Sequence, residues 1–173
     1  MTVIAKIGFD HMAILGDTLA KIAAEKAGII KRGTALVLES QEKEAMDVLN
    51  KAAERADIKT TKVVNLDEIR ILPQKDGKQC FSYAGYDAVT MKMLGVHQYE
   101  NAVAAMLAAE LFFEKYFAGK KSVPERKALQ HAIREGIDRT QWMGRMELVS
   151  NDPFFLMDGA HNSNGVEALK KSL

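Results

Sequence analysis

The stretch TVIAKIGFDHMAILGDTLAKIAAEKAGIIKRGTALVL, residues 2–38, decides the fold class. It begins with a short β-branched run at 2–7 and continues at 17–30 with apolar residues at the spacing of one helix face. It ends with the apolar run ALVL at 35–38. Because parallel neighbouring strands need a long crossover connection, the order strand, helix, strand predicts a parallel sheet. The chain is therefore predicted to be α/β.

The segments that follow extend this pattern and then change it. Ser40 is a predicted helix N-cap, and apolar residues form a helical stripe over 45–56. Another short strand is predicted at 62–64. Over 67–93 the residues alternate on either side of the dipeptide Asp-Gly at 76–77, which suits a tight turn with positive φ. We expect an antiparallel ribbon there.

Two further helices are predicted at about 98–117 and 124–137, and both are expected to pack on the sheet. Ser122 and Glu125 have the spacing of a capping box for the second. The remaining elements are two short strands and a helix, at 146–149, 154–157 and from Gly165 onward. Since a strand, a loop and one helix cannot bury a core alone, the chain from Arg145 is interpreted as the opening of a second domain.

Composition excludes several classes of protein. Of the 173 residues, 47% are hydrophobic and 27% are charged, which is enough for a core and excludes disorder of the whole chain. The 24 Lys and Arg residues nearly balance the 23 Asp and Glu residues, so nucleic acid is not a favoured partner. The single cysteine, Cys80, excludes an intrachain disulfide and fits a cytoplasmic location. No apolar run approaches the length of a membrane span, so no membrane association is expected.

Two loops that follow predicted strands carry polar groups suited to chemistry. Residues 8–11 (GFDH) and 158–162 (DGAHN) each offer a carboxylate, a glycine and a histidine. In open α/β sheets, ligands bind outside the carboxyl ends of the strands, so both loops are candidate sites for a metal, a phosphate or proton transfer. Asp and Gly also form ordinary turns, and spacing alone favours that interpretation.

Lys26 falls on the apolar stripe of its predicted helix, four residues after Ile22 and seven after Leu19. One interpretation is snorkelling, in which the stem is buried and the ammonium reaches water. The other is a desolvated lysine with an enriched neutral amine, usable as a nucleophile or a site of modification. The pattern alone favours snorkelling.

Three polar residues near predicted helix starts and domain junctions are further candidates, and two of them have two interpretations each. Asn101 can cap a helix or bind a ligand, Arg145 can clamp a phosphate or be a surface charge, and His97 is interpreted as a turn residue. The chain contains no G-x-x-x-x-G-K-[ST] loop for phosphate. A nucleotide site would therefore be incomplete within this chain.

Taken together, these segments resemble one family, the folylpolyglutamate synthases and dihydrofolate synthases, which are folate-modifying members of the Mur-type ATP-dependent amide ligases. The resemblance spans nearly the whole chain and rests on motifs in the family's order. They are IGFDH at 7–11 with LGDT at 15–18 and EKAGIIK at 25–31, GVHQYENA at 95–102, WMGRME at 142–147, and DGAHN at 158–162.

The resemblance implies roles for six residues. His11 is similar to a metal-ligand histidine, and Lys26 to a catalytic lysine that is carbamylated and helps to hold a second Mg²⁺. An apolar helix face would suit that lysine, because only the neutral amine takes up carbon dioxide. The residues similar to ATP-contacting positions are Asn101, Arg145 and Asp158, together with His161, which also has an expected catalytic role near the nucleotide.

The implied reaction uses ATP to phosphorylate a carboxyl group of a folate or dihydropteroate, after which the amine of L-glutamate attacks the acyl phosphate. The resemblance further implies that residues 1–141 are the C-terminal part of a central ATP-binding ligase domain of Mur-ligase type. Residues 142–173 would be a linker and the start of a C-terminal α/β domain. The family's phosphate-binding loop lies outside this chain, so the chain alone is expected to be an inactive, monomeric fragment.

Two other functions remain open from the sequence. One is a cell-wall-precursor Mur-type ligase, a class with a similar fold and the same modified lysine. The sequence motifs at 95–102 and 158–162 favour the folate branch over this class. The other is a non-catalytic nucleotide-binding or structural module, which the missing phosphate loop would suit.

Overall fold

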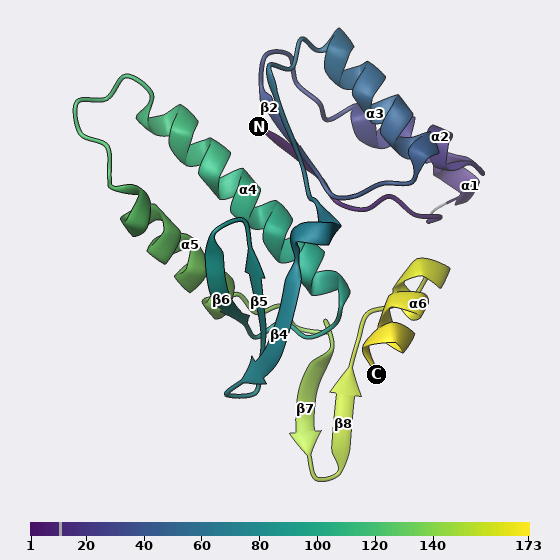
Figure 1. Ribbon diagram of the computed structural model, residues 1–173. Coiled ribbons are helices and arrows are strands. Elements are labelled where there is room, and N and C mark those ends of the chain that lie inside the picture. The colour runs from purple at the N-terminus through teal and green to yellow at the C-terminus, as the bar shows by residue number, and fades with distance from the viewer. Residues whose placement is uncertain (11) are drawn as a thin grey trace. The chain divides into compact units, whose positions relative to one another are not determined.

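The computed structural model describes residues 1–10 and 12–173 of the chain (Figure 1). The described residues form two compact units. Unit 1 contains Met1–Asn65 and Val103–Tyr116, and unit 2 contains Leu66–Ala102 and Phe117–Leu173. The predicted domain boundary after residue 141 falls inside unit 2 and stays a prediction.

Unit 1 is built on a parallel sheet, as the opening stretch of sequence predicts. Its strands are β1 (Thr2–Ile4), β2 (Ala35–Leu38) and β3 (Thr60–Val63), in the order β1-β2-β3. Both pairs are parallel. The central strand β2 is the apolar run ALVL, and its last three residues are buried, as expected for a strand covered on both faces. The predicted α/β class is confirmed.

Three helices of unit 1 pack an apolar face against this sheet. They are α1 (Met12–Leu15), α2 (Leu19–Ala27) and α3 (Lys43–Arg55), and α2 and α3 lie side by side (Figure 1). The Thr18 hydroxyl caps α2 by accepting a hydrogen bond from the backbone N–H of Lys21 at 3.2 Å. Alternate residues of β1 and β2 join both helices in one core, whose main members are Ile4, Ile7, Ile22, Leu36, Leu38 and Leu49.

Unit 2 contains the predicted antiparallel ribbon. After a short 3₁₀ turn, η1, three strands follow in the order β4-β5-β6. Asp76 and Gly77 have φ of 51° and 72°, as in a type I′ hairpin, whose twist matches that of the flanking strands. Most of β5 is buried, and the Phe81 ring packs edge-on against Tyr99 with ring centroids 5.7 Å apart. The bounds are η1 (Leu66–Glu68), β4 (Arg70–Lys75), β5 (Lys78–Tyr83) and β6 (Tyr86–Met91).

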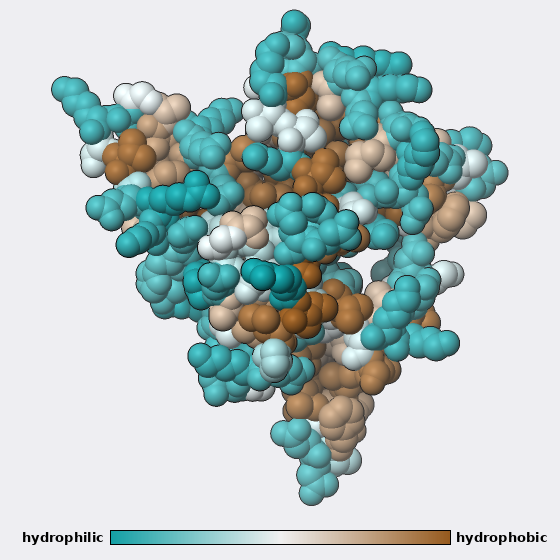
Figure 2. All heavy atoms as spheres, viewed as in Figure 1, coloured by the Kyte–Doolittle hydropathy of each residue, from teal (hydrophilic) through white to brown (hydrophobic). Residues whose placement is uncertain are grey.

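The later elements of the chain are α4 (His97–Phe117), α5 (Arg126–Arg139), β7 (Glu147–Asn151), β8 (Phe154–Met157) and α6 (Ser163–Ser172). Helix α5 packs on β6 of the antiparallel ribbon, within unit 2. Strands β7 and β8 form a two-stranded antiparallel hairpin. Hydrophobic side chains gather on the surface of this hairpin (Figure 2), among them the exposed Leu148, Phe154 and Phe155. Within the described residues, no helix combines the length and apolar character needed to span a membrane.

Two predicted helix caps are wrong. Helix α3 begins at Lys43 rather than after Ser40, because the intervening loop is tied to the chain after β1 by the side chain of Gln41. The capping box at Ser122 and Glu125 does not form, and α5 begins only at Arg126. Pro124 explains this difference, since a proline disfavours helical φ and ψ at the residue before it.

Candidate functional site

The start of α4 is held in place by side chains of β5 and α6. Gly95, immediately before the helix, has φ of 104°, a conformation that L side chains rarely adopt. The buried Gln79 amide on β5 donates to the carbonyl oxygens of Met93 at 2.8 Å and Gly95 at 3.2 Å. The hydroxyl of Ser172 accepts from the N–H of Val96 at 3.1 Å. The backbone that leads into α4 therefore has a fixed course within unit 2.

His97 is the first residue of α4 rather than a turn residue, and it is half-buried. Burial lowers the pKa of its imidazole below the ordinary value, and the nearby Arg145 acts in the same direction while Asp158 opposes it. Among the described residues, its Nδ1 is buried without a hydrogen-bond partner. These surroundings favour the neutral ring.

A chain of side-chain hydrogen bonds runs from this imidazole to a predicted nucleotide contact. Nε2 of His97 lies 3.1 Å from the amide nitrogen of Gln98, which is 8% exposed. The Oε1 atom of Gln98 accepts from Nδ2 of Asn101 at 2.9 Å. Asn101 is exposed, one helical turn after His97. Its amide is therefore anchored on one side and open to solvent on the other.

The hairpin β7–β8 and the loops at its base supply the second group of site residues, after those at the start of α4. The carboxylate of Asp158 accepts hydrogen bonds from the backbone N–H of Met146 and of Ala160, both at 2.8 Å. The N–H of Gly159 donates to the carbonyl of Gly144 at 2.7 Å. Met146 is 6% exposed and has φ of 46°, a strained conformation for a side chain of this size. Asp158 thus fixes the loop that presents the neighbouring Arg145.

Arg145 and His161 are both exposed at this hairpin. The ring Nδ1 of His161 lies 2.8 Å from the carbonyl oxygen of Gly159, so its N–H donates there. Asn162 caps α6 by accepting from the N–H of Gly165 at 2.8 Å. The loop at 158–162 therefore combines ordinary turn and cap chemistry with an accessible guanidinium and an accessible imidazole.

Unit 2 brings together the predicted nucleotide-contact residues. Asn101 is joined to His97 through Gln98, and Asp158 and Arg145 lie close enough to His97 to affect its pKa. Their roles toward a nucleotide stay predictions. Sequence reasoning missed the contribution of Gln98 and interpreted His97 as a turn residue. The available signal was a pair of adjacent polar side chains at the start of a long apolar helix.

Lys26 belongs to unit 1, and the alternative interpretation of it as a desolvated lysine is wrong, whereas the favoured interpretation had its ammonium reaching water. It is exposed in the last turn of α2, whose buried residues are Ile22 and Ala23. A cation there interacts favourably with the helix dipole. The stripe pattern does not specify which of its positions the neighbouring elements cover: Ala27 and Ile30 pack against the core, whereas Lys26 is exposed. Its carbamylation stays a prediction.

His11, the predicted metal-ligand histidine, lies outside the described residues. The loop before it is shaped by two side chains that sequence reasoning did not select. The buried Glu39 accepts from the N–H of Lys6 at 2.6 Å, and Gln41 accepts from the N–H of Ile7 at 2.8 Å. The described part of the chain contains no group of three His, Cys, Asp or Glu side chains arranged to hold a metal ion. The described residues, which do not include His11, therefore do not form a Mg²⁺ site by themselves.

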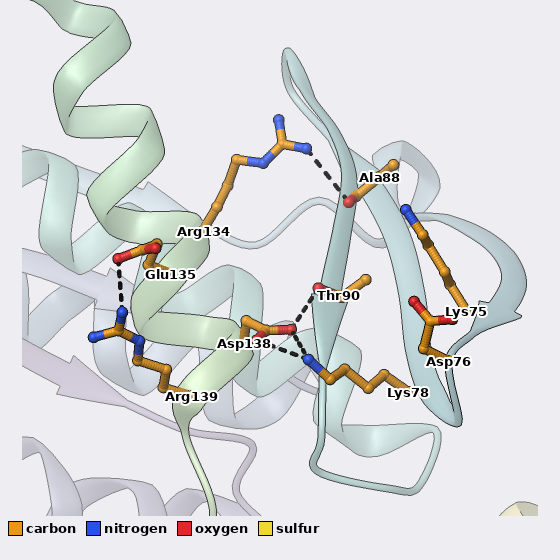
Figure 3. Close-up of a pocket in the computed structure, with 9 residues that line it drawn as sticks. All are labelled: Lys75, Asp76, Lys78, Ala88, Thr90, Arg134, Glu135, Asp138 and Arg139. Atoms are coloured by element: carbon orange, nitrogen blue, oxygen red, sulfur yellow. Dashed lines mark hydrogen bonds and ion pairs between the residues drawn. The ribbon is translucent and has the colours of Figure 1, made fainter.

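A polar pocket of about 360 Å³ lies between the ribbon and α5 (Figure 3). Lys78 and Asp138 form an ion pair across it at 2.7 Å, and the Thr90 hydroxyl donates to the same carboxylate at 2.6 Å. Arg134 donates to the backbone carbonyls of Asp87 and Ala88. These bonds connect α5 to the ribbon, so we interpret the pocket as a structural contact.

Asp138→Asn is expected to destabilise the protein by about 1–2 kcal/mol at neutral pH, because it removes a charged acceptor from Lys78 and Thr90. Those two hydrogen bonds lower the pKa of Asp138 below its ordinary value of 3.8. The stabilisation is therefore present above pH 3.8 and is lost as pH falls through the lowered pKa. Urea unfolding at several pH values checks this, with the exposed Asp47→Asn as control. An equal difference between the native protein and the Asp138 variant at pH 7 and pH 2.5 would contradict it.

The fold and the site define the class of protein. The family model of the Mur ligase middle domain matches residues 1–109, which is more than half of the chain. The chain belongs to this family.

Curated relatives narrow the comparison to the folate branch. The chain is 35% identical to the dihydrofolate synthase/folylpolyglutamate synthase of Bacillus subtilis, over 100% of the chain and 39% of that protein. It is 34% identical to a folylpolyglutamate synthase of Arabidopsis thaliana, over 97% of the chain and 28% of that protein. The chain thus spans well under half the length of these relatives.

Solved structures of the same branch share the fold. The Mycobacterium tuberculosis folylpolyglutamate synthase complexed with ADP and AMPPCP is 31% identical, with a TM-score of 0.76 over 99% of this chain and 38% of that one. An FPGS–AMPPCP–folate complex gives a TM-score of 0.84 at 24% identity, over 98% of this chain and 40% of that one, and so supports the fold alone. The predicted Mur-ligase-type architecture is confirmed.

Proposed function

We propose that this chain is part of an ATP-dependent ligase that joins L-glutamate to the carboxyl group of a folate or dihydropteroate through an acyl phosphate. The observation that carries the proposal is the site in unit 2, where the family motifs at 95–102, 142–147 and 158–162 lie around His97. The match of nearly the whole chain to part of the synthases of this branch supports the same conclusion.

The residues of this site have complementary tasks in such a reaction. The open side of the Asn101 amide offers hydrogen bonds to ATP. The exposed Arg145 guanidinium offsets negative charge that develops on the transferred phosphoryl group, and Asp158 fixes the backbone that carries it. His161 is an accessible imidazole beside the same loop. Phosphoryl transfer depends mainly on positioning and electrostatics, which these residues supply.

We propose that Mg²⁺ binds together with ATP. Divalent metal ions neutralise phosphate charge during such transfers, but the described residues of this chain do not assemble a site for one. His11 and a carbamylated Lys26 are proposed to contribute to metal binding in the complete enzyme. A cytoplasmic location, which the single cysteine fits, and a monomeric state are proposed together with this function.

The function is tested by incorporation of labelled L-glutamate by the product of the full reading frame that encodes this chain. Dihydropteroate and a reduced folate are offered in separate reactions, each with and without ATP. ATP-dependent incorporation into either acceptor establishes the ligase and identifies its branch. Absence of incorporation into both, by a folded protein that binds ATP, overturns the folate proposal and favours the cell-wall-precursor Mur ligase.

Lys26→Ala is expected to lower this incorporation about 10- to 100-fold, the usual loss when a group that supports a metal ligand set is removed. Because Lys26 is exposed, the substitution should leave thermal stability unchanged. The rate of incorporation and the melting temperature are measured together, with the exposed Lys51→Ala on α3 as the matched control. Full activity of the Lys26 variant would exclude a catalytic role for this lysine.

A further inference from the structure

The N-terminal end of α4 receives a hydrogen-bond acceptor from another helix. Backbone N–H groups at the start of a helix have no partner within that helix. Val96, at the N-cap position of α4, has an apolar side chain that cannot accept a hydrogen bond. The hydroxyl of Ser172, the last residue of α6, accepts from the Val96 N–H at 3.1 Å. These two residues are 76 positions apart in the chain, so this cap depends on where α6 lies.

The Ser172 hydroxyl has a fixed orientation. It donates its proton to the carbonyl oxygen of Ala168, one turn earlier in α6, at 2.7 Å. A hydroxyl has a single O–H donor and two acceptor lone pairs. Because the proton is committed to Ala168, a lone pair faces the Val96 N–H. The hydroxyl is therefore oriented as an acceptor toward α4 by its own helix.

Helix α6 is not anchored by buried side chains. The structure describes all of Ser163–Ser172, and none of these residues is buried. The helix begins from the loop at 158–162, where the Asn162 side chain caps its first turn. Its other end is joined to α4 by Ser172. A segment with few buried apolar groups opens locally at a small cost in free energy. One hydrogen bond can therefore decide how long this end of α6 stays joined to α4.

We propose that Ser172 is a positioning residue, and that its bond to Val96 is a latch that keeps the loop at 158–162 beside the start of α4 for ATP binding. The inference rests on the proposed function, in which the motifs at 95–102 and 158–162 belong to the ATP site. Ser172 acts through the backbone of α4 and through the loop that precedes α6. It does not itself contact the nucleotide.

The latch and ATP binding must favour each other if this is correct. A closed latch that raises the affinity for ATP is in turn stabilised by bound ATP, by the same factor. The Val96 amide reports the latch directly, because its N–H is protected from exchange with solvent while Ser172 accepts from it. The side chain of Val96 is 42% exposed, so burial adds little protection.

The test measures hydrogen exchange of the Val96 amide by NMR and ATP affinity by isothermal titration calorimetry, using the product of the full reading frame. In Ser172→Ala, we expect Val96 to exchange about three- to tenfold faster and ATP to bind about three- to tenfold more weakly, the effect of losing one ordinary hydrogen bond. Alanine has a higher helix propensity than serine, so α6 itself should not be weakened.

Two variants and a reference amide serve as controls. Ser172→Thr keeps the hydroxyl and should restore both the exchange rate and the affinity. Ser163→Ala removes another serine of α6, an exposed one, and should change neither. The amide of the fully buried Phe81 on β5 reports global unfolding, and its exchange should be the same in all four proteins.

The outcomes separate the inference from the proposed function. Faster Val96 exchange and weaker ATP binding in Ser172→Ala, both restored in Ser172→Thr, support the inference. Faster exchange with unchanged ATP affinity shows a merely structural contact and overturns it. In the unmodified protein, ATP should slow the exchange of Val96, and no response to bound ATP overturns the inference even if the variants do not fold. Absence of ATP binding by the folded, unmodified protein instead overturns the proposed function.

Discussion

Arg145→Ala is expected to lower the rate of ATP-dependent glutamate incorporation about 100- to 1000-fold, with a smaller change in the KM for ATP. The guanidinium is proposed to stabilise charge that develops during phosphoryl transfer, and loss of one such group typically costs two to three decades in kcat. Because Arg145 is exposed, its removal should leave the fold intact. Steady-state kinetics of the full reading-frame product measure this effect.

Two variants show whether the effect comes from charge, geometry or surface alteration. Arg145→Lys keeps the charge but loses the planar fork that binds two phosphate oxygens, so an intermediate rate is expected. Arg139→Ala removes another exposed arginine of unit 2, one paired with Glu135 on α5, and should leave the rate unchanged. If Arg145→Ala retained the native rate, the proposed role of this hairpin in catalysis would be wrong.

Removal of the Arg145 charge also has a spectroscopic consequence. Arg145 lowers the pKa of the His97 ring, so Arg145→Ala should raise it. NMR titration of His97 in the two proteins detects this change without reference to activity.

Gly95→Ala is expected to destabilise the protein by about 2–4 kcal/mol. The φ of 104° penalises any side chain, at a cost of about 1–2 kcal/mol. A carbon added at this position would also lie 2.8 Å from the His97 ring and 2.9 Å from the sulfur of Met146. Both groups would have to move, and forcing atoms into such a packed position costs about 1–3 kcal/mol.

The control for this prediction separates backbone strain from crowding. Gly77, in the β4–β5 turn, also has a positive φ, of 72°, but a side-chain carbon there would meet no atom within 4 Å. Gly77→Ala should therefore lose only the backbone part, about 1–2 kcal/mol. Midpoints of urea unfolding compare the two variants. Equal losses would mean that the contact among Gly95, His97 and Met146 contributes nothing to stability.

The displacement of His97 in Gly95→Ala should also alter the position of Asn101, the predicted nucleotide contact. Displacement of the ring breaks its hydrogen bond with Gln98, which in turn holds Asn101. We therefore expect the affinity for ATP to fall in this variant under conditions where it remains folded.

Local patterns were sufficient to predict most of the elements. The apolar run at 35–38 is β2 with the same limits, and the Asp-Gly dipeptide at 76–77 forms the expected turn. Such features depend on the periodicity of neighbouring side chains and on backbone conformations open to particular residues. The capping predictions at Ser40 and Ser122 failed because a cap competes with other constraints, in these cases a loop contact and Pro124.

The candidate site was predicted as a set of residue types rather than as an arrangement. The motifs at 95–102 and 158–162 pointed to Asn101 and Asp158 through family resemblance. They did not reveal that the Asp158 carboxylate accepts hydrogen bonds from the backbone N–H groups of Met146 and Ala160. Nor did they reveal that Gln98 links Asn101 to His97. Each of these contacts depends on side-chain rotamers and on the fixed course of the backbone, which spacing in the sequence does not specify.

The sequence by itself determined the α/β class, the order of the elements and the family, because periodicity and ordered motifs are properties of the chain that need no knowledge of contacts. Only the tertiary structure decided the exposure of Lys26 and the burial of His97. Exposure depends on which neighbouring elements cover a residue, and those neighbours come from distant parts of the chain. Asp158 and Arg145, far from His97 in sequence, influence its pKa only because the fold places the β7–β8 hairpin beside the start of α4.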